Sequence, residues 1–281
     1  MELESIGITA IFLCKLSLIR SSLNVTVPPQ IRSRFLDRLD LTQKHQADTE
    51  LIPPLKLRHV IGQDDNFALD RAWQLIEYCG LKPCDAVLDV GCGVGSMARS
   101  LVHYLDSQGR YEGFDINKEF IDWLQKNITQ KHPNFRFKHV DIWNSNYNAK
   151  GKIVASKFKF PYESDSFDVV FLGSVFTHML PMDLENYLSE ITRVLKPNGK
   201  SLVTYFLLTP ERQNLTDDKL RTGFMDTGMG YSVTNRAVPE EAVAYKQEYI
   251  LNLYKKNNLK IIPPIKYGNL QDAIVAKKSS F

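Results

Sequence analysis

The chain has 281 residues, of which 43% are apolar and 24% charged, as in an ordinary globular protein of one large or two modest domains. Its formal net charge at pH 7 is only +3, which indicates no basic face for nucleic acid or an anionic membrane, so neither is expected as a partner. The four cysteines include no Cys-x-x-Cys pair and have core-like neighbours, which predicts free thiols in a reducing compartment, the cytoplasm, and no metal site.

Residues 1–50 are predicted to form an N-terminal extension, to which the sequence assigns no function. The apolar run Ile6–Ile19 in this extension is interrupted by Lys15 and follows an acidic start, unlike a secretory leader. It is also shorter than the ~20 residues that a membrane-spanning helix needs. Residues 51–281 are therefore expected to hold the folded domain, which opens with an amphipathic helix ending at Gly80.

A buried strand, a glycine-rich turn and a helix are predicted next. Ala86–Val90 is apolar except for Asp89, as a strand covered on both faces should be. Glycines then occupy alternate positions, and they permit a tight turn and a close approach of ligand to backbone. They are Gly91, Gly93 and Gly95. Apolar residues recur afterwards at three- and four-residue steps as far as Leu105, so a helix should begin there with its free N–H groups toward the ligand.

Acidic residues also end the next two predicted strands. Asp115 closes the strand Tyr111–Asp115, where a carboxylate can accept hydrogen bonds from the two hydroxyls of a ribose. Asp141 follows the strand Phe135–Val140. A dinucleotide fingerprint, G-x-G-x-x-G, would need a glycine at Ser96, so the spacing disfavours a ligand with a pyrophosphate, such as NAD.

The middle of the chain continues the alternation of strand and helix. Phe167–Leu172 is predicted to be a central buried strand, and Gly173 gives a bend at its carboxyl end, where open α/β sheets bind ligands. A helix over Leu184–Leu195 and a strand over Ser201–Leu208 should follow. The polar stretch Asn144–Lys159 has no period and is predicted to be an insertion that leans over the site.

Two motifs resemble those of the class I S-adenosylmethionine (SAM)-dependent methyltransferases. One is Asp-x-Gly-x-Gly-x-Gly, from Asp89 to Gly95. The other begins with Phe160-Pro161, continues through Ser166-Phe167-Asp168 to His178, and is followed by Leu195-Lys196-Pro197-Asn198-Gly199. The resemblance implies a Rossmann-like three-layer α/β sandwich, with a seven-stranded, mostly parallel sheet whose last strand is antiparallel.

The resemblance also implies that SAM is the cofactor and that a small molecule accepts the methyl group (EC 2.1.1.-). At matching positions, Asp115 would hold the ribose and Asp141 the adenine amino group, with apolar neighbours against the purine. The cofactor-binding residues expected are Asp89, Gly91, Cys92, Gly93, Gly95, Asp115, Ile116, Asp141, Ile142, Leu172 and Gly173. The sequence indicates neither the oligomeric state nor which acceptor atom is methylated.

The end of the chain is predicted to be a helix, Val238–Lys256, followed by the strands Leu259–Ile265 and Leu270–Ala276. Their short connection requires antiparallel pairing. Thr209–Pro239 is polar, is broken by glycine and proline, and is too long for a simple connection. We predict that it is a lid that selects the acceptor.

One candidate for catalysis and two other function classes stay open. His178, just past the fourth strand, is the histidine best placed for a general base, although a histidine that only packs there is the favoured interpretation. The first alternative function is a SAM-binding protein of the same fold that does not transfer a methyl group. The second is an NAD-dependent oxidoreductase, which Ser96 and the antiparallel last strand disfavour.

Overall fold

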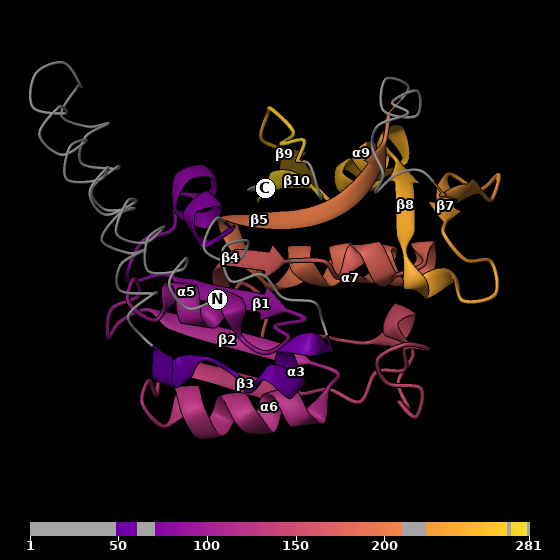
Figure 1. Ribbon diagram of the computed structural model, residues 1–281. Helices are drawn as coiled ribbons and strands as arrows, with labels where there is room; N and C mark the ends of the chain where they lie inside the picture. The colour runs from indigo at the N-terminus through magenta and orange to yellow at the C-terminus, as the bar shows by residue number, and fades with distance from the viewer. Residues whose placement is uncertain (1–48, 61–70, 210–222, 269–270, 280–281) are drawn as a thin grey trace, which may run out of the picture. The chain divides into compact units, whose positions relative to one another are not determined.

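The computed structural model describes residues 49–60, 71–209, 223–268 and 271–279 (Figure 1). The predicted N-terminal extension therefore lies outside the described residues, except for its last two positions. Residues 210–222 of the predicted lid also lie outside them. The described chain begins with η1 (Thr49–Leu51), α3 (Leu55–His59) and a helical segment from residue 71 that ends in η2 (Leu75–Cys79).

A mostly parallel sheet is the centre of the domain. Its parallel strands are β1 (Ala86–Val90), β2 (Arg110–Asp115), β3 (Phe135–His139), β4 (Phe167–Leu172) and β5 (Leu195–Leu208). They lie in the order β3-β2-β1-β4-β5, and β10 (Asp272–Lys278) runs antiparallel beside β5. Next to β10 lies β9 (Leu259–Ile261), again antiparallel to its neighbour. These strands confirm the Rossmann-like sheet with an antiparallel last strand.

Alternate residues of each strand point to opposite faces of the sheet. Both faces are buried, because helices cover each of them. Val87, Val169 and Leu202 pack on the face covered by the segment ending at Cys79, by α5 (Ser96–Leu101) and by α6 (Lys118–Leu124). The neighbouring residues Leu88, Val170 and Val203 pack on the other face. Helices on the two sides of one sheet make the expected three-layer sandwich.

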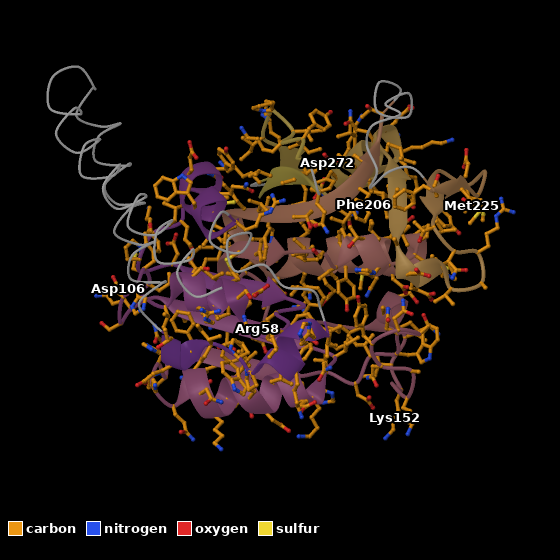
Figure 2. All side chains as sticks on the ribbon, viewed as in Figure 1. Arg58, Asp106, Lys152, Phe206, Met225 and Asp272 are labelled. Carbon is orange, nitrogen blue, oxygen red and sulfur yellow. The ribbon has the colours of Figure 1, made fainter. Side chains whose placement is uncertain are left out.

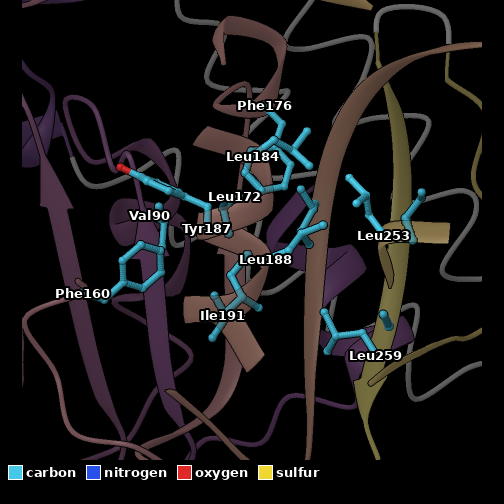
Figure 3. Close-up of a cluster of buried hydrophobic side chains, with 14 of the residues drawn as sticks. Val90, Phe160, Leu172, Phe176, Leu184, Tyr187, Leu188, Ile191, Leu253 and Leu259 are labelled. Carbon is cyan, nitrogen blue, oxygen red and sulfur yellow. The ribbon is translucent and has the colours of Figure 1, made fainter. Parts of the chain in front are cut away.

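The second face is covered by α7 (Pro181–Val194) and α9 (Gln247–Lys256) (Figure 1). Leu184, Leu188 and Ile191 recur at helical spacing along α7, and each is fully buried. Figure 3 shows these side chains in one cluster with Leu172 of β4. Burial of this stripe, rather than helix propensity, accounts for the position of α7.

Three strands extend the sheet beyond the seven expected, so the described residues form a ten-stranded sheet. The last residues of β5, Phe206–Leu208, pair in parallel with β8 (Val243–Lys246). β7 (Tyr231–Val233) and β6 (Met225–Asp226) continue beyond β8 in antiparallel pairing.

The predicted helix Val238–Lys256 is therefore wrong in its first part. A short turn, η6 (Pro239–Glu241), and then β8 precede α9. Val243 and Tyr245 are β-branched and aromatic residues that suit a strand, and the free edge of β5 gives this strand a partner. Pairing with a distant strand overrides the local helical period here.

Candidate functional site

The glycine-rich turn after β1 is bonded to the end of β2. The N–H groups of Gly91 and Cys92 donate to the carbonyl oxygen of Phe114 at 2.9 and 3.0 Å. The N–H of Gly93 donates to Oδ2 of Asp115 at 2.8 Å. The turn and the acid that the sequence placed at this edge of the sheet therefore form one hydrogen-bonded unit.

Two of the glycines are required by the chain itself. A Cβ at Gly95 would lie 2.3 Å from Cδ2 of Leu124 on α6, and its φ of +82° favours glycine. A Cβ at Gly91 would lie 2.5 Å from Cγ2 of Val175, which follows β4. Gly91 and Gly95 thus let the turn pack closely against neighbouring elements.

Asp115 is held in a fixed orientation by backbone donors. Its Oδ1 accepts from the N–H of Asn117 at 2.8 Å, and Asn117 in turn caps α6 by accepting from two backbone N–H groups. Burial raises the pKa of Asp115, while hydrogen bonds from the backbone of Asn117, Gly93 and Ile116 act in the opposite direction. The side chain is half-buried, so part of the carboxylate faces solvent.

The donor and acceptor set around Asp115 fits the ribose of an adenosine ligand. A carboxylate has about four acceptor positions on its two oxygens. Each oxygen of Asp115 accepts one of the two short backbone bonds, which leaves acceptor capacity on both. Two vicinal hydroxyls can use that capacity, which is the arrangement that adenosine-type sites employ.

Asp89 and Cys92, at the beginning of the turn, are both buried. Asp89 is 2% exposed and accepts a hydrogen bond from the hydroxyl of Tyr111. Burial raises the pKa of Asp89 to about 7, the Tyr111 hydrogen bond lowers it, and the nearby charge of Asp115 raises it further. The Cys92 side chain is buried in the core, which raises the pKa of its thiol well above the usual value. Cys92 therefore offers a ligand only its backbone.

The end of β3 lies directly beside Asp115, since Val140 N–H donates to the Asp115 carbonyl at 3.1 Å. Asp141 follows, half-buried, and Nδ2 of Asn148 approaches its Oδ1 at 3.3 Å. Ile142 is buried, and the half-buried Ile116 packs against the same apolar cluster. The structure thus brings together the two acids and the two isoleucines expected around ribose and adenine.

The end of β4 contributes backbone rather than side chains. Leu172 is fully buried in the core, and a Cβ at Gly173 would lie 2.7 Å from the ring of Phe171. Ser174 adopts a φ of +59°, and its N–H donates to Oγ1 of Thr204 at 2.8 Å. The chain therefore turns sharply at the carboxyl end of the strand.

His178 ends the short helix η5 (Phe176–His178) beyond this turn. Its Nδ1 lies 3.1 Å from the carbonyl oxygen of Glu240, and the ring of Tyr147 meets it edge-on with centroids 5.5 Å apart. Burial lowers the pKa of His178, and hydrogen bonds to the backbone of Glu240 and Glu241 oppose that shift.

Sequence reasoning did not single out Tyr147 or Glu240, which lie 31 and 62 positions from His178. Tyr147 belongs to the insertion that was expected to lean over the site, and it contacts His178. Burial raises the pKa of Tyr147, and the charge of Asp115 adds to that effect. Tyr147 thus contacts His178 and also lies within the electrostatic influence of Asp115.

Comparison with known proteins finds methyltransferases. Residues 88–203 match the family model described as a methyltransferase domain. The 2-phytyl-1,4-naphtoquinone methyltransferase of Trichormus variabilis is 27% identical over 138 residues, which are 48% of this chain and 54% of that protein. A sterol 24-C-methyltransferase of Aspergillus fumigatus is 30% identical over 175 residues, which are 61% of this chain and 41% of that protein. The chain thus spans about half, or less, of the curated relatives it matches.

Solved structures show the same fold. A SAM-dependent methyltransferase from Aquifex aeolicus has a TM-score of 0.52 and 16% identity, covering 81% of this chain and 99% of its own. The 1,6-didemethyltoxoflavin-N1-methyltransferase of Burkholderia thailandensis, solved with its substrate and S-adenosylhomocysteine, has a TM-score of 0.52, 14% identity and 92% coverage of both chains. The family model thus matches residues 88–203 to a methyltransferase domain, and these solved structures share the fold of the chain.

Proposed function

We propose that the protein transfers a methyl group from SAM to a small-molecule acceptor. The observation that carries the proposal is the Asp115 carboxylate, which is fixed by Gly93 and Asn117 at the carboxyl edge of the sheet with acceptor capacity on both oxygens. The matched methyltransferase model supports the same reaction class. The relatives' names, which refer to a quinone and a sterol, favour an apolar acceptor.

In this proposal, Asp115 holds the ribose and Asp141 the adenine amino group. Ile116 and Ile142 contact the purine, and the backbone from Gly91 to Gly95 passes beneath the amino-acid part. Backbone at Leu172 and Gly173 completes the site. Asp89 is buried and accepts a hydrogen bond from Tyr111, so it contributes to the end of the strand on which the turn begins.

When bound, SAM supplies a methyl group activated by a sulfonium, and the reaction is an in-line displacement by the acceptor. The first task of the protein is alignment, because holding the reacting atoms in near-attack geometry can contribute about 7–11 kcal/mol. The carboxyl groups of Asp115 and Asp141 favour a cationic cofactor by charge.

We further propose His178 as the group that takes the proton of a hydroxyl acceptor. A carbonyl oxygen only accepts hydrogen bonds, so the contact with Glu240 requires the proton to lie on Nδ1. Nε2 then carries the lone pair that a base needs. Burial lowers the pKa of His178, which keeps the ring neutral at pH 7.

Thr209–Pro239 is proposed to close over the acceptor. Of the described part of this segment, β7 pairs with β8, so closure would concern the residues around that hairpin. Slow amide exchange throughout 209–239 in the free protein would contradict the lid.

The cytoplasm is the proposed compartment. Among the described residues, Cys79, Cys84 and Cys92 are free thiols, in keeping with a reducing compartment.

Calorimetry with SAM, S-adenosylhomocysteine and NAD in parallel tests the proposal. Binding of the first two without NAD is expected, and NAD binding alone would restore the oxidoreductase alternative. Incubation with methyl-labelled SAM and a metabolite extract then separates a transferase from a protein that only binds SAM. Label in a low-molecular-weight product that is lost with Asp115→Ala is the expected result.

A further inference from the structure

One segment beside the site combines exposed apolar side chains with concentrated positive charge. We call the region formed by residues 143–159 and Met182 the loop surface. Its apolar members Trp143, Ile153, Val154 and Met182 are 43%, 39%, 47% and 75% exposed. Its lysines are Lys150, Lys152, Lys157 and Lys159, all exposed.

The apolar side chains of the loop surface are held outward by a bonded backbone. Trp143 N–H donates to the Ile153 carbonyl at 2.8 Å, which places the two residues next to each other. Nδ2 of Asn186 on α7 donates to the carbonyl oxygens of Ala155 and Phe158 at 2.8 and 2.9 Å. Met182 lies one turn before Asn186 on the same face of α7, so it borders the segment.

The charge of the loop surface is not balanced by its own segment. The sequence has no aspartate or glutamate between Asp141 and Glu163, so the four lysines alone exceed the +3 of the whole chain. Within the described residues, none of the four lysine side chains has an ion-pair or hydrogen-bond partner. Figure 2 shows Lys152 at the outer edge of the domain.

Acids that pack against the segment are turned inward or already paired. Glu240 is 9% exposed and accepts from the hydroxyl of Ser145 at 3.3 Å. Asp183 accepts from Ser156 and is half-buried. Glu190 forms an ion pair with Arg193 at 2.6 Å. The positive potential of the lysines therefore faces solvent.

We propose that the loop surface docks the protein on an anionic lipid membrane. Aromatic and aliphatic side chains flanked by lysines suit the boundary between headgroups and acyl chains, where the apolar groups insert and the lysines meet the headgroups. The exposed aromatic side chains of the loop surface are Trp143 and Tyr147, whereas Ile153, Val154 and Met182 are aliphatic. Aliphatic groups suit insertion among acyl chains and offer no face on which nucleic-acid bases could stack. The low net charge of the chain concealed this local concentration.

Docking at this surface is peripheral. Among the described parts of the chain, no helix has the length and apolar character needed to cross a bilayer. Tyr147, in the same segment, contacts His178 and lies within the electrostatic influence of Asp115. The surface thus borders the candidate site, so a docked protein would present that site to molecules dissolved in the lipid.

Sedimentation with vesicles tests docking without SAM or an acceptor, so its result is independent of the proposed methyl transfer. We expect binding to vesicles of phosphatidylglycerol and phosphatidylcholine in equal parts, and much weaker binding to phosphatidylcholine alone. Lys150→Gln/Lys152→Gln should weaken binding about 25-fold, at about five-fold for each lysine near the surface. The matched control Lys255→Gln/Lys260→Gln makes the same charge change on α9 and β9 and should change binding less than about twofold, because salt screens distant charges.

Fluorescence tests insertion. The sequence has three tryptophans, and Trp143 is the exposed one among those described, so vesicles should shift emission to the blue and Trp143→Phe should remove the change. Trp143→Ser/Ile153→Ser should lower binding at least tenfold, as expected for losing inserted apolar surface, at an unchanged melting temperature. Equal loss in both lysine pairs, no shift of Trp143 emission, or binding to RNA but not to vesicles would each overturn the proposal.

Discussion

Replacing Asp115 with alanine removes the carboxylate on which the cofactor assignment depends. The side chain accepts from the backbone of Gly93 and Asn117 and keeps acceptor capacity. Loss of hydrogen bonds to a charged group costs about 1.5–3 kcal/mol, so Asp115→Ala should weaken SAM binding about 10- to 150-fold. S-adenosylhomocysteine, which keeps the ribose, should lose affinity by a similar factor.

The same substitution also leaves two backbone N–H groups without their partner. Gly93 is buried, so its N–H loses its partner away from water, and we expect a loss of about 1–3 kcal/mol in the free energy of unfolding. Calorimetry with SAM and urea denaturation measure the two effects separately. Asp122→Ala, which removes an exposed acid on α6, is the matched control and should leave SAM affinity unchanged. If Asp115→Ala binds SAM as tightly as the parent, Asp115 is not part of the site.

Three further predictions concern the turn, the buried acid and the histidine. Gly93→Val should abolish SAM binding and, since φ is +54°, cost about 1–2 kcal/mol of stability; collapse of the far-ultraviolet circular dichroism would show a purely structural glycine. Asp89 binds a proton in the folded state up to about pH 7, whereas an unfolded aspartate loses its proton near pH 4. As the pH rises from about 4 to 7, the free energy of unfolding of wild type should therefore fall by up to about 1.4 kcal/mol per pH unit relative to that of Asp89→Asn. Urea titrations measure this difference, and parallel curves for the two proteins would refute the raised pKa. His178→Gln should lower kcat about 10²–10⁴-fold at unchanged SAM affinity, with wild-type kcat rising through a pKa below 6.5; an unchanged kcat would make His178 a packing residue.

Much of the cofactor side was predictable because its signals are local. An acid marks the end of each strand: Asp89 is the penultimate residue of β1, Asp115 is the last residue of β2, and Asp141 lies two positions after the end of β3. Parallel strands bring those ends to one edge of the sheet, so a sequence pattern is enough to gather them. The structure adds that Tyr111 donates a hydrogen bond to one oxygen of Asp89. Tyr111 lies on β2, two positions before Gly113, the residue that pairs with Asp89.

The acceptor side was less predictable because its contacts join distant segments. His178 meets Tyr147 and Glu240, and neither carries a period or motif that would announce the contact. β8 pairs with residues of β5 that lie more than 30 positions earlier, and its sequence merges with the helix that follows. The helical period predicted a helix at β8, but pairing with the free edge of β5 makes this segment a strand.

The 14-residue β5 has different neighbours along its length. Residues as far as Tyr205 pair with β4 and β10, while Phe206–Leu208 hold β8 through three residue pairs, and β7 and β6 are attached through β8. Both residues of β6 are exposed at the outer end of this extension, whereas Val243, Ala244 and Tyr245 of β8 are fully buried. β6 can therefore detach without separating β4 from β5, and we expect its amides to exchange at a lower free energy of opening than those of β1 and β4. In the proposed enzyme, this outer edge could open for a bulky acceptor while the strands proposed to hold the cofactor stay folded.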